Sequence, residues 1–301
     1  MSTQERWNTR MPAGRIAYVN GRYLAHEEAG VHIEDRGLQL GDAIYEVVAV
    51  NANRFVDEEE HLDRLERSLR EVEIAMPMAR AAMKFVFREV VRRNALRNGF
   101  LYLQITRGAF RRDHPIPSQH QRPTLILTAL HVNRAQQNAR DEKGIAVVTK
   151  PDLRWGRCDI KTTQLLGNLL AKTAARRAGA HEAWLVDEDG FVTEGASTTA
   201  WIVTDGGEIV TRPLTNAILP GVTRRVILAV AEEAQLKLTE RPFTPDEARG
   251  AREAFISSAS GPAVPVIRID GDMVGEGVPG PITRRVRELY RDHAKAAPLL
   301  R

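Results

Sequence analysis

The chain has 301 residues, of which 43% are hydrophobic and 27% are charged, and its formal net charge is +4. This balance excludes an intrinsically disordered chain and is typical of a globular protein. The apolar runs are too short to span a membrane, and the N-terminus has no apolar signal core. Arginine pairs are scattered and aromatic residues make up only 6%, so no nucleic-acid surface is expected. The single cysteine, Cys158, excludes an internal disulfide and favours a cytoplasmic protein.

The first part of the chain predicts a small α+β domain, residues 1–132. Asn20-Gly21 is typical of a type I′ turn, and apolar residues at three- and four-residue spacing predict two amphipathic helices. The loop 108–122 holds three arginines and two histidines, and long loops of this kind are usually functional or disordered. In chain order we expect a hairpin at 16–25, a strand at 42–50, helices at 57–76 and around 83–91, and strands at 100–107 and 123–132.

A polar stretch at 131–143 indicates a domain boundary, and we expect an interdomain linker at 133–142. The rest, 143–301, predicts a larger α+β domain because most of its strands are joined as hairpins and alternate with helices. The expected elements are a strand at 144–150, a helix at 164–179, hairpins at 182–194 and 198–211, helices at 220–238 and from Thr244-Pro245, strands at 254–259 and 264–275, and a helix at 281–295.

Lys161 is the first residue that suggests chemistry. It follows Asp159-Ile160 in a short segment that we expect to be partly buried, and burial lowers the pKa of a lysine. Most lysines are solvated surface charges. A lysine that is neutral part of the time is a nucleophile that forms Schiff bases with carbonyl compounds and pyridoxal phosphate.

Three further segments add to this hypothesis. Glu194 ends a predicted strand and is followed by small residues, so its carboxylate has room to hold a pyridine nitrogen in its protonated form. Leu219-Pro220-Gly221-Val222-Thr223 is a turn directly before a helix, and helix N-termini bind phosphate. The segment 257–261 is a second strand exit that is rich in hydroxyl groups. Each has an ordinary structural explanation, but together they are what pyridoxal phosphate needs.

No metal site is predicted. His26 and His32 lie six residues apart, which is not the spacing of a helical zinc-binding pair.

From about residue 16 to 292 the chain resembles the fold-type IV pyridoxal-phosphate aminotransferases, most closely the bacterial D-amino acid transaminases. The segments that carry the resemblance are Glu34-Asp35-Arg36-Gly37, Gly41 to Glu46, Glu60 to Leu65, Arg154 to Lys161, Val192 to Gly195 and Ile218 to Arg224. The resemblance implies a two-domain α+β fold and a homodimer that holds pyridoxal 5′-phosphate between the domains.

The resemblance also implies roles for single residues. Lys161 matches the lysine that binds the cofactor covalently and then transfers protons, and Glu194 matches the partner of the pyridine nitrogen. The remaining cofactor-binding positions are Arg64, Ser197, Leu219, Val222, Thr223 and Ser260. Arg64 rests on the resemblance alone, because helical periodicity puts it off the apolar stripe and predicts a solvated side chain.

In the D-amino acid enzymes, an Arg-x-His pair on the loop after the fourth strand binds the substrate α-carboxylate together with a tyrosine. Here Arg112 and His114 have the matching spacing, and Tyr45 supplies the tyrosine. The resemblance implies that the loop pair comes from the partner subunit. One departure is Gly261-Pro262, in a stretch where the family has more threonine, which affects the contact made by Ser260 and the shape of the pocket.

The sequence therefore predicts a D-amino acid transaminase that transfers an amino group between a D-amino acid, such as D-alanine, and 2-oxoglutarate. The alternatives within the fold are a branched-chain L-amino acid transaminase, an R-selective amine transaminase and a 4-amino-4-deoxychorismate lyase. A non-catalytic binding protein is the alternative outside enzymology, and it has no use for both Lys161 and Glu194. The expected partners are small amino and keto acids and a second copy of the chain, with no nucleic acid and no membrane.

Overall fold

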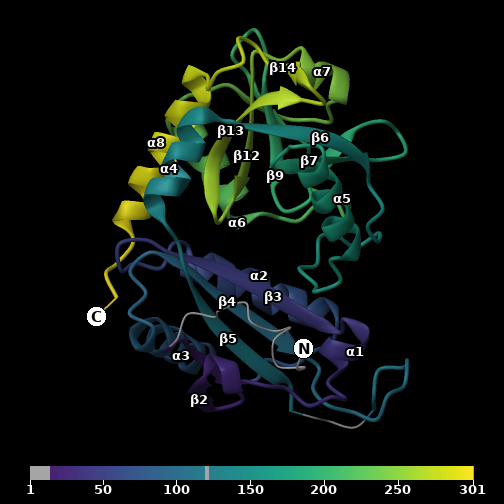
Figure 1. Ribbon diagram of the computed structural model, residues 1–301, viewed down its shortest axis with the longest axis vertical. Coiled ribbons are helices and arrows are strands. Elements are labelled where there is room, and N and C mark those ends of the chain that lie inside the picture. The colour runs from purple at the N-terminus through teal and green to yellow at the C-terminus, as the bar shows by residue number, and fades with distance from the viewer. Residues whose placement is uncertain (1–13, 119–121, 301) are drawn as a thin grey trace, which may run out of the picture. The chain divides into compact units, whose positions relative to one another are not determined.

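The computed structural model describes residues 14–118 and 122–300. The first 13 residues of the predicted N-terminal domain and residues 119–121 of the predicted loop therefore lie outside the described part, as does residue 301. The chain forms two compact units (Figure 1), Met1–Val132 with Leu299–Arg301, and Asn133–Pro298. No helix in the described part is both long and apolar enough to cross a membrane.

The first unit is built on an antiparallel sheet with the strand order β2-β1-β5-β4-β3. The predicted turn at Asn20-Gly21 is present, with both residues at positive φ. Two amphipathic helices supply the apolar stripes predicted from sequence, and Leu62, Leu65 and Leu69 are at most 1% exposed. The elements are β1 (Ile16–Val19), β2 (Arg22–Ala25), β3 (Ala43–Val50), α2 (Glu58–Glu71), α3 (Arg80–Arg93), β4 (Gly99–Thr106) and β5 (Thr124–His131).

Two short helical segments in this unit were not predicted. They are a 3-10 helix, η2 (His26–Glu28), and α1 (Arg36–Leu40). The Asp35 carboxylate accepts a hydrogen bond from the Gly37 amide at 2.8 Å and caps α1. A helix of five residues is too short to show a periodic pattern in the sequence.

The second unit contains a nine-stranded mixed sheet, in which β11-β10-β9-β12-β13-β6-β7-β8 follow one another and β14 pairs with β13. Its parallel pairs are β10–β11, β13–β6 and β6–β7. The strands are β6 (Ile145–Pro151), β7 (Glu182–Val186), β8 (Val192–Gly195), β9 (Thr199–Val203), β10 (Ile209–Thr211), β11 (Leu238–Glu240), β12 (Glu253–Ser258), β13 (Gly261–Ile269) and β14 (Asp272–Met273).

The core of this unit joins residues from distant strands. Trp184 on β7, Ile202 on β9 and Ile256 on β12 belong to one buried cluster, so these strands share a common interior. The helices of the unit are α4 (Arg134–Lys143), α5 (Leu166–Arg177), α6 (Val222–Glu233), α7 (Pro245–Arg249) and α8 (Pro281–Ala296). Helix α7 begins as predicted, with Thr244 as its cap and Pro245 as its first residue.

Two segments differ from the sequence-based expectation. The stretch 133–142, expected as a linker, is helix α4 within the second unit. The Asn133 side chain caps α4, and Arg287 on α8 donates to the Asp141 carbonyl at 2.8 Å. The stretch is polar because most of the helix surface faces solvent. Helix α6 ends at Glu233 rather than near 238, since Gln235 has a positive φ of 55° and the chain then enters β11.

Candidate active site

Lys161 lies in the loop between β6 and α5 and is half-buried. Its neighbours Asp159 and Ile160 are both 4% exposed, and Arg157 donates to the Asp159 carboxylate at 2.9 Å. The Thr162 amide donates to the Ile160 carbonyl at 2.8 Å, which closes a three-residue turn centred on Lys161. The partly buried environment predicted for this lysine is therefore present, and its backbone is held on both sides.

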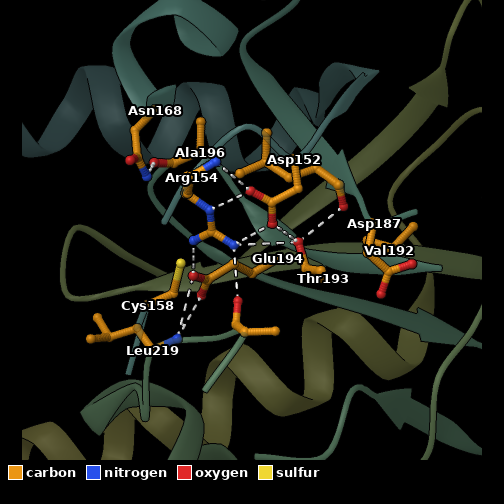
Figure 2. A network of polar contacts seen from close by, with 12 residues as sticks. Asp152, Arg154, Cys158, Asn168, Asp187, Val192, Thr193, Glu194, Ala196 and Leu219 are labelled. Atoms are coloured by element: carbon orange, nitrogen blue, oxygen red, sulfur yellow. Dashed lines mark hydrogen bonds and ion pairs between the residues drawn. The ribbon is translucent and has the colours of Figure 1, made fainter. Parts of the chain in front are cut away.

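Glu194 lies on β8 and is 6% exposed. Its carboxylate pairs with the Arg154 guanidinium, and the Leu219 amide donates to both carboxylate oxygens at 3.3 Å. Figure 2 shows these contacts, with Arg154 between Asp152 and Glu194. Burial raises the pKa of the Glu194 carboxyl, and the charges of Arg154 and Lys161 act against that rise. Lys161 and Glu194 thus belong to the same unit, and the charge of Lys161 is among those that act on the Glu194 carboxyl.

Arg154 holds the polar network around Glu194. It donates to Asp152 at 2.7 Å and to the Ala217 carbonyl at 3.0 Å, and Thr193 donates to Asp152 at 2.7 Å. Burial alone would lower the pKa of Arg154, but its hydrogen bond to Asp152 and the charge of Glu194 outweigh burial and raise it. Arg154 therefore stays cationic. Sequence reasoning gave it no role, although it lies inside one of the segments that carry the resemblance.

The N-terminus of α6 lies just after Leu219. Gly221 is its cap residue, without a side chain to cap the helix, and Val222 and Thr223 are its first two residues, each 5% exposed. The Arg225 amide donates back to the Gly221 carbonyl at 3.0 Å. The first amides of a helix generally lack partners within the helix and point toward its N-terminal end, which suits a phosphate group.

The structure gives the two predicted serines other partners. Ser197 donates to Glu182 at 2.8 Å, and Glu182 is fully buried and paired with Lys172 at 2.9 Å. Ser260 lies exposed in the turn between β12 and β13, with its hydroxyl 3.0 Å from that of Ser258. Glycine at position 261 allows close packing, because a Cβ there would lie 2.5 Å from Val264 Cγ2 and would force that side chain to shift. The Gly261-Pro262 departure is thus accommodated by the β12–β13 hairpin.

Arg64 in the first unit is buried, and the solvated side chain predicted from periodicity is wrong. It is 9% exposed, and its guanidinium donates to the Glu46 carboxylate at 2.7 and 2.9 Å. His61 Nδ1 lies 2.8 Å from the same carboxylate. Burial of Glu46 opposes ionisation, but Arg64 and His61 outweigh it and hold the pKa of Glu46 well below its usual range. The missed signal is Glu46 itself, a carboxylate on the apolar face of β3 that needs buried cations.

Tyr45, Arg112 and His114 also lie in the first unit. Tyr45 is half-buried on the face of β3 opposite to Glu46, and its ring centroid is 5.9 Å from that of Tyr102. Burial raises the pKa of Tyr102 to about 12. Arg112 and His114 are exposed, and their side chains make no hydrogen bond or ion pair with other residues of the described ranges. These two side chains are accessible to a ligand.

The groups in the second unit fit pyridoxal 5′-phosphate. An accessible amine, a buried carboxylate held by a permanent cation and a helix N-terminus match the aldehyde, the ring nitrogen and the phosphate of the cofactor, respectively. When bound, the cofactor supplies an electron sink for the bonds at the substrate α-carbon. Within 14–118 and 122–300, no cluster of three or more His, Cys, Asp or Glu residues has the geometry to hold a metal ion.

The chain belongs to the class IV aminotransferase family. Residues 43–269 match the model of this family, which covers β3 of the first unit through β13 of the second. It is therefore a pyridoxal-phosphate-dependent aminotransferase, and the predicted enzyme class, cofactor and α+β fold are confirmed.

Two curated relatives are similar over most of the chain. A D-alanine aminotransferase of Staphylococcus haemolyticus is 36% identical over 279 residues, covering 93% of this chain and 98% of the relative. A D-alanine aminotransferase of Bacillus licheniformis is 38% identical over 268 residues, covering 89% of this chain and 93% of the relative.

Solved structures give the same fold. A branched-chain amino acid aminotransferase of T.th. with pyridoxamine 5′-phosphate matches with a TM-score of 0.87 and 26% identity, over 96% of this chain and 97% of that one. A branched-chain amino acid aminotransferase of Escherichia coli matches with a TM-score of 0.83 and 25% identity, over 92% and 93%.

Proposed function

We propose that this protein is a D-amino acid transaminase that moves an amino group between a D-amino acid, such as D-alanine, and 2-oxoglutarate. The observation that carries the proposal is the sequence identity of 36% and 38% with two D-alanine aminotransferases, over most of the length of this chain and of each relative. The solved branched-chain enzymes are more distant in sequence, at 25% and 26% identity.

In this proposal, Lys161 binds the cofactor covalently and transfers the proton at the substrate α-carbon. Its turn geometry and the nearby buried carboxylate of Glu194 support both roles. Glu194 holds the ring nitrogen protonated, and Arg154 keeps the carboxylate in place. The other proposed cofactor ligands are Arg64, Ser197, Leu219, Val222, Thr223 and Ser260. Among them the N-terminus of α6 has the strongest physical support.

We propose that Tyr45, Arg112 and His114 bind the substrate α-carboxylate. A guanidinium forms two parallel hydrogen bonds with a carboxylate, and Arg112 has no competing partner among the described residues. Because the carboxylate is present on both the amino donor and the keto acceptor, one site of this kind serves both halves of the reaction.

The proposal includes a homodimer, in which the loop pair of one protomer completes the substrate site of its partner. Apolar side chains on and near α5 support an interface there, because Leu153, Leu166 and Leu169 are 75%, 70% and 59% exposed. The two units act as a small N-terminal domain and a larger cofactor-binding domain. With one cysteine in the chain, we also propose a cytoplasmic location.

A panel of D- and L-amino donors, assayed on the purified enzyme with 2-oxoglutarate, tests the proposal. Turnover with D-alanine and none with L-leucine is expected, and the absence of transfer from every D-amino acid would refute the substrate assignment. The branched-chain solved structures favour an L-specific enzyme as the second candidate. The panel separates the two. Dependence on a keto-acid acceptor excludes a lyase of the same fold.

A further inference from the structure

Arg36 is a buried cation that the proposed chemistry leaves without a role. It is 4% exposed, lies at the first position of α1, and its Nε donates to the Asp42 carboxylate at 2.8 Å. A buried charge is costly unless it is fully paired, so its remaining contacts indicate what the position is used for.

The other two nitrogens of the guanidinium bind the loop that carries Arg112 and His114. Nη1 donates to the Asp113 carbonyl at 2.7 Å, and Nη2 donates to the His114 carbonyl at 3.3 Å. These are successive backbone groups that directly follow Arg112. Pro115 comes next and restricts the backbone of His114 to extended conformations. Arg36 therefore holds the two peptide planes on either side of His114, and the first of these planes begins at the residue that follows Arg112.

The first residues of the same loop are also held by backbone groups of Arg36 and Glu34. The Arg36 amide donates to the Gly108 carbonyl at 2.9 Å, and the Phe110 amide donates to the Glu34 carbonyl at 3.1 Å. Gly108 has a φ of 103°, and a Cβ there would lie 2.6 Å from the Arg122 carbonyl oxygen, so the two ends of the loop meet at a glycine.

Asp42 fixes Arg36 from the opposite side. It also accepts from Arg107 Nε at 2.7 Å, and Arg107 in turn donates to the Val72 carbonyl at the end of α2 at 2.6 Å. Burial of Asp42 opposes ionisation, but the hydrogen bonds from Arg107 and Arg36 outweigh it and lower its pKa. The ionised Asp42 carboxylate thus links Arg36, which binds the loop, to the rest of the first unit.

From this geometry we infer that Arg36 is a positioning residue for the substrate carboxylate, acting through the backbone of Asp113 and His114. The inference rests on the proposed function, because it takes Arg112 and His114 as the groups that bind the carboxylate. Arg36 touches no substrate atom. It orients a segment in which the side chains of Arg112 and His114 make no hydrogen bond or ion pair with the described residues.

The first test is Arg36→Lys. Lysine keeps the ion pair with Asp42 but lacks the planar fork that reaches two carbonyls at once. We expect KM for D-alanine and for 2-oxoglutarate to rise about tenfold, while kcat stays within about twofold of the wild type and the cofactor absorbance is unchanged. This pattern is expected because the variant loses binding that the ground state and the transition state share. Arg111→Ala, an exposed neighbour on the same loop, is the control and should match the wild type. An unchanged KM, or a loss of cofactor with KM unchanged, would overturn the inference.

A double variant shows whether Arg36 acts through Arg112. If it does, Arg36→Lys adds little to the rise in KM that Arg112→Ala causes alone, because coupled residues are not additive. Independent, multiplying effects would contradict the inference. If Arg36→Lys does not fold, Asp42→Asn leaves Arg36 in place while weakening its anchor, and should raise KM in the same direction.

Hydrogen exchange gives a readout that needs no substrate. Residues 110–118 should exchange faster in Arg36→Lys than in the wild type, while β3 and β4 stay protected. Unchanged exchange in this segment refutes the anchoring role. A wild-type enzyme that transfers from no D-amino acid refutes the proposed function instead, and the exchange comparison then decides the inference separately.

Discussion

For single residues, three buried carboxylates of the described chain are each paired with a cationic or imidazole side chain. Glu194 is paired with Arg154, Glu46 with Arg64 and His61, and Glu182 with Lys172. Each pair costs desolvation and is retained only with good geometry. Substitution of one of these carboxylates therefore tests what its buried charge contributes.

Glu194→Gln tests the most important of these positions. Glutamine keeps the shape but cannot hold the ring nitrogen protonated by its charge, so we expect kcat for D-alanine to fall by about 100-fold or more. The absorbance of the bound cofactor should persist, because Lys161 is intact. Glu188→Gln, an exposed neighbour, is the matched control. A variant with full kcat would contradict the assigned role.

At the level of single elements, the short helix α7 begins at a side-chain cap that can be recognised in the sequence. Thr244 caps α7, where its hydroxyl accepts from the Glu247 amide at 3.1 Å, and Pro245 fills the first position. The preceding Phe243 is 1% exposed and belongs to the core cluster of the second unit. The cap therefore fixes where the chain leaves the core and enters the helix.

Thr244→Ala should lower the free energy of unfolding by about 1 kcal/mol, the usual cost of losing a helix cap. The measurement is the urea midpoint of the purified protein. Thr244→Ser keeps a hydroxyl at the position and should stay close to the wild type. Equal losses in the two variants would show that the methyl group, and not the hydrogen bond, stabilises the helix start.

At the scale of the whole molecule, stability should depend on acid pH. The pKa values of Glu46, Asp42 and Asp152 are lowered, in each case because arginine contacts outweigh the opposing effect of burial. A carboxyl whose pKa is lower in the folded state than in the unfolded state stabilises the protein at pH values above the unfolded pKa, which is near 4.5 for Glu46. This contribution is lost as the pH falls toward the pKa of the folded state.

We therefore expect the contribution of these three carboxyls to the free energy of unfolding to be flat near neutral pH and to fall steadily below about pH 4.5. Chemical denaturation at a series of pH values measures this. Glu46→Gln should be less stable at pH 7, because Arg64 loses its buried partner, and should show a shallower acid slope. An acid slope of Glu46→Gln as steep as that of the wild type would mean that other carboxyls determine the loss of stability at low pH.

Much of the fold can be predicted from the amino-acid sequence because the signals for it are local. The Asn20-Gly21 turn, the apolar stripe of Leu62, Leu65 and Leu69, and the Thr244-Pro245 helix start all form as predicted. The motifs that include Lys161 and Glu194 identified the family and the cofactor, since both lie in short segments that keep a recognisable order.

Which buried charges pair with one another could not be predicted from the sequence and is seen in the folded chain. Arg154 and Glu194 are 40 residues apart, and Arg36 meets His114 at a separation of 78. No periodic pattern reports a contact between such distant positions, so Arg64 was expected in solvent although it is buried against Glu46. For the same reason α4 was not predicted. Its polar sequence is typical of a linker, and the contact with Arg287 that holds it in the second unit comes from a distant part of the chain. Local chemistry sets turns, caps and stripes, whereas the pairing of buried charges depends on how distant segments come together.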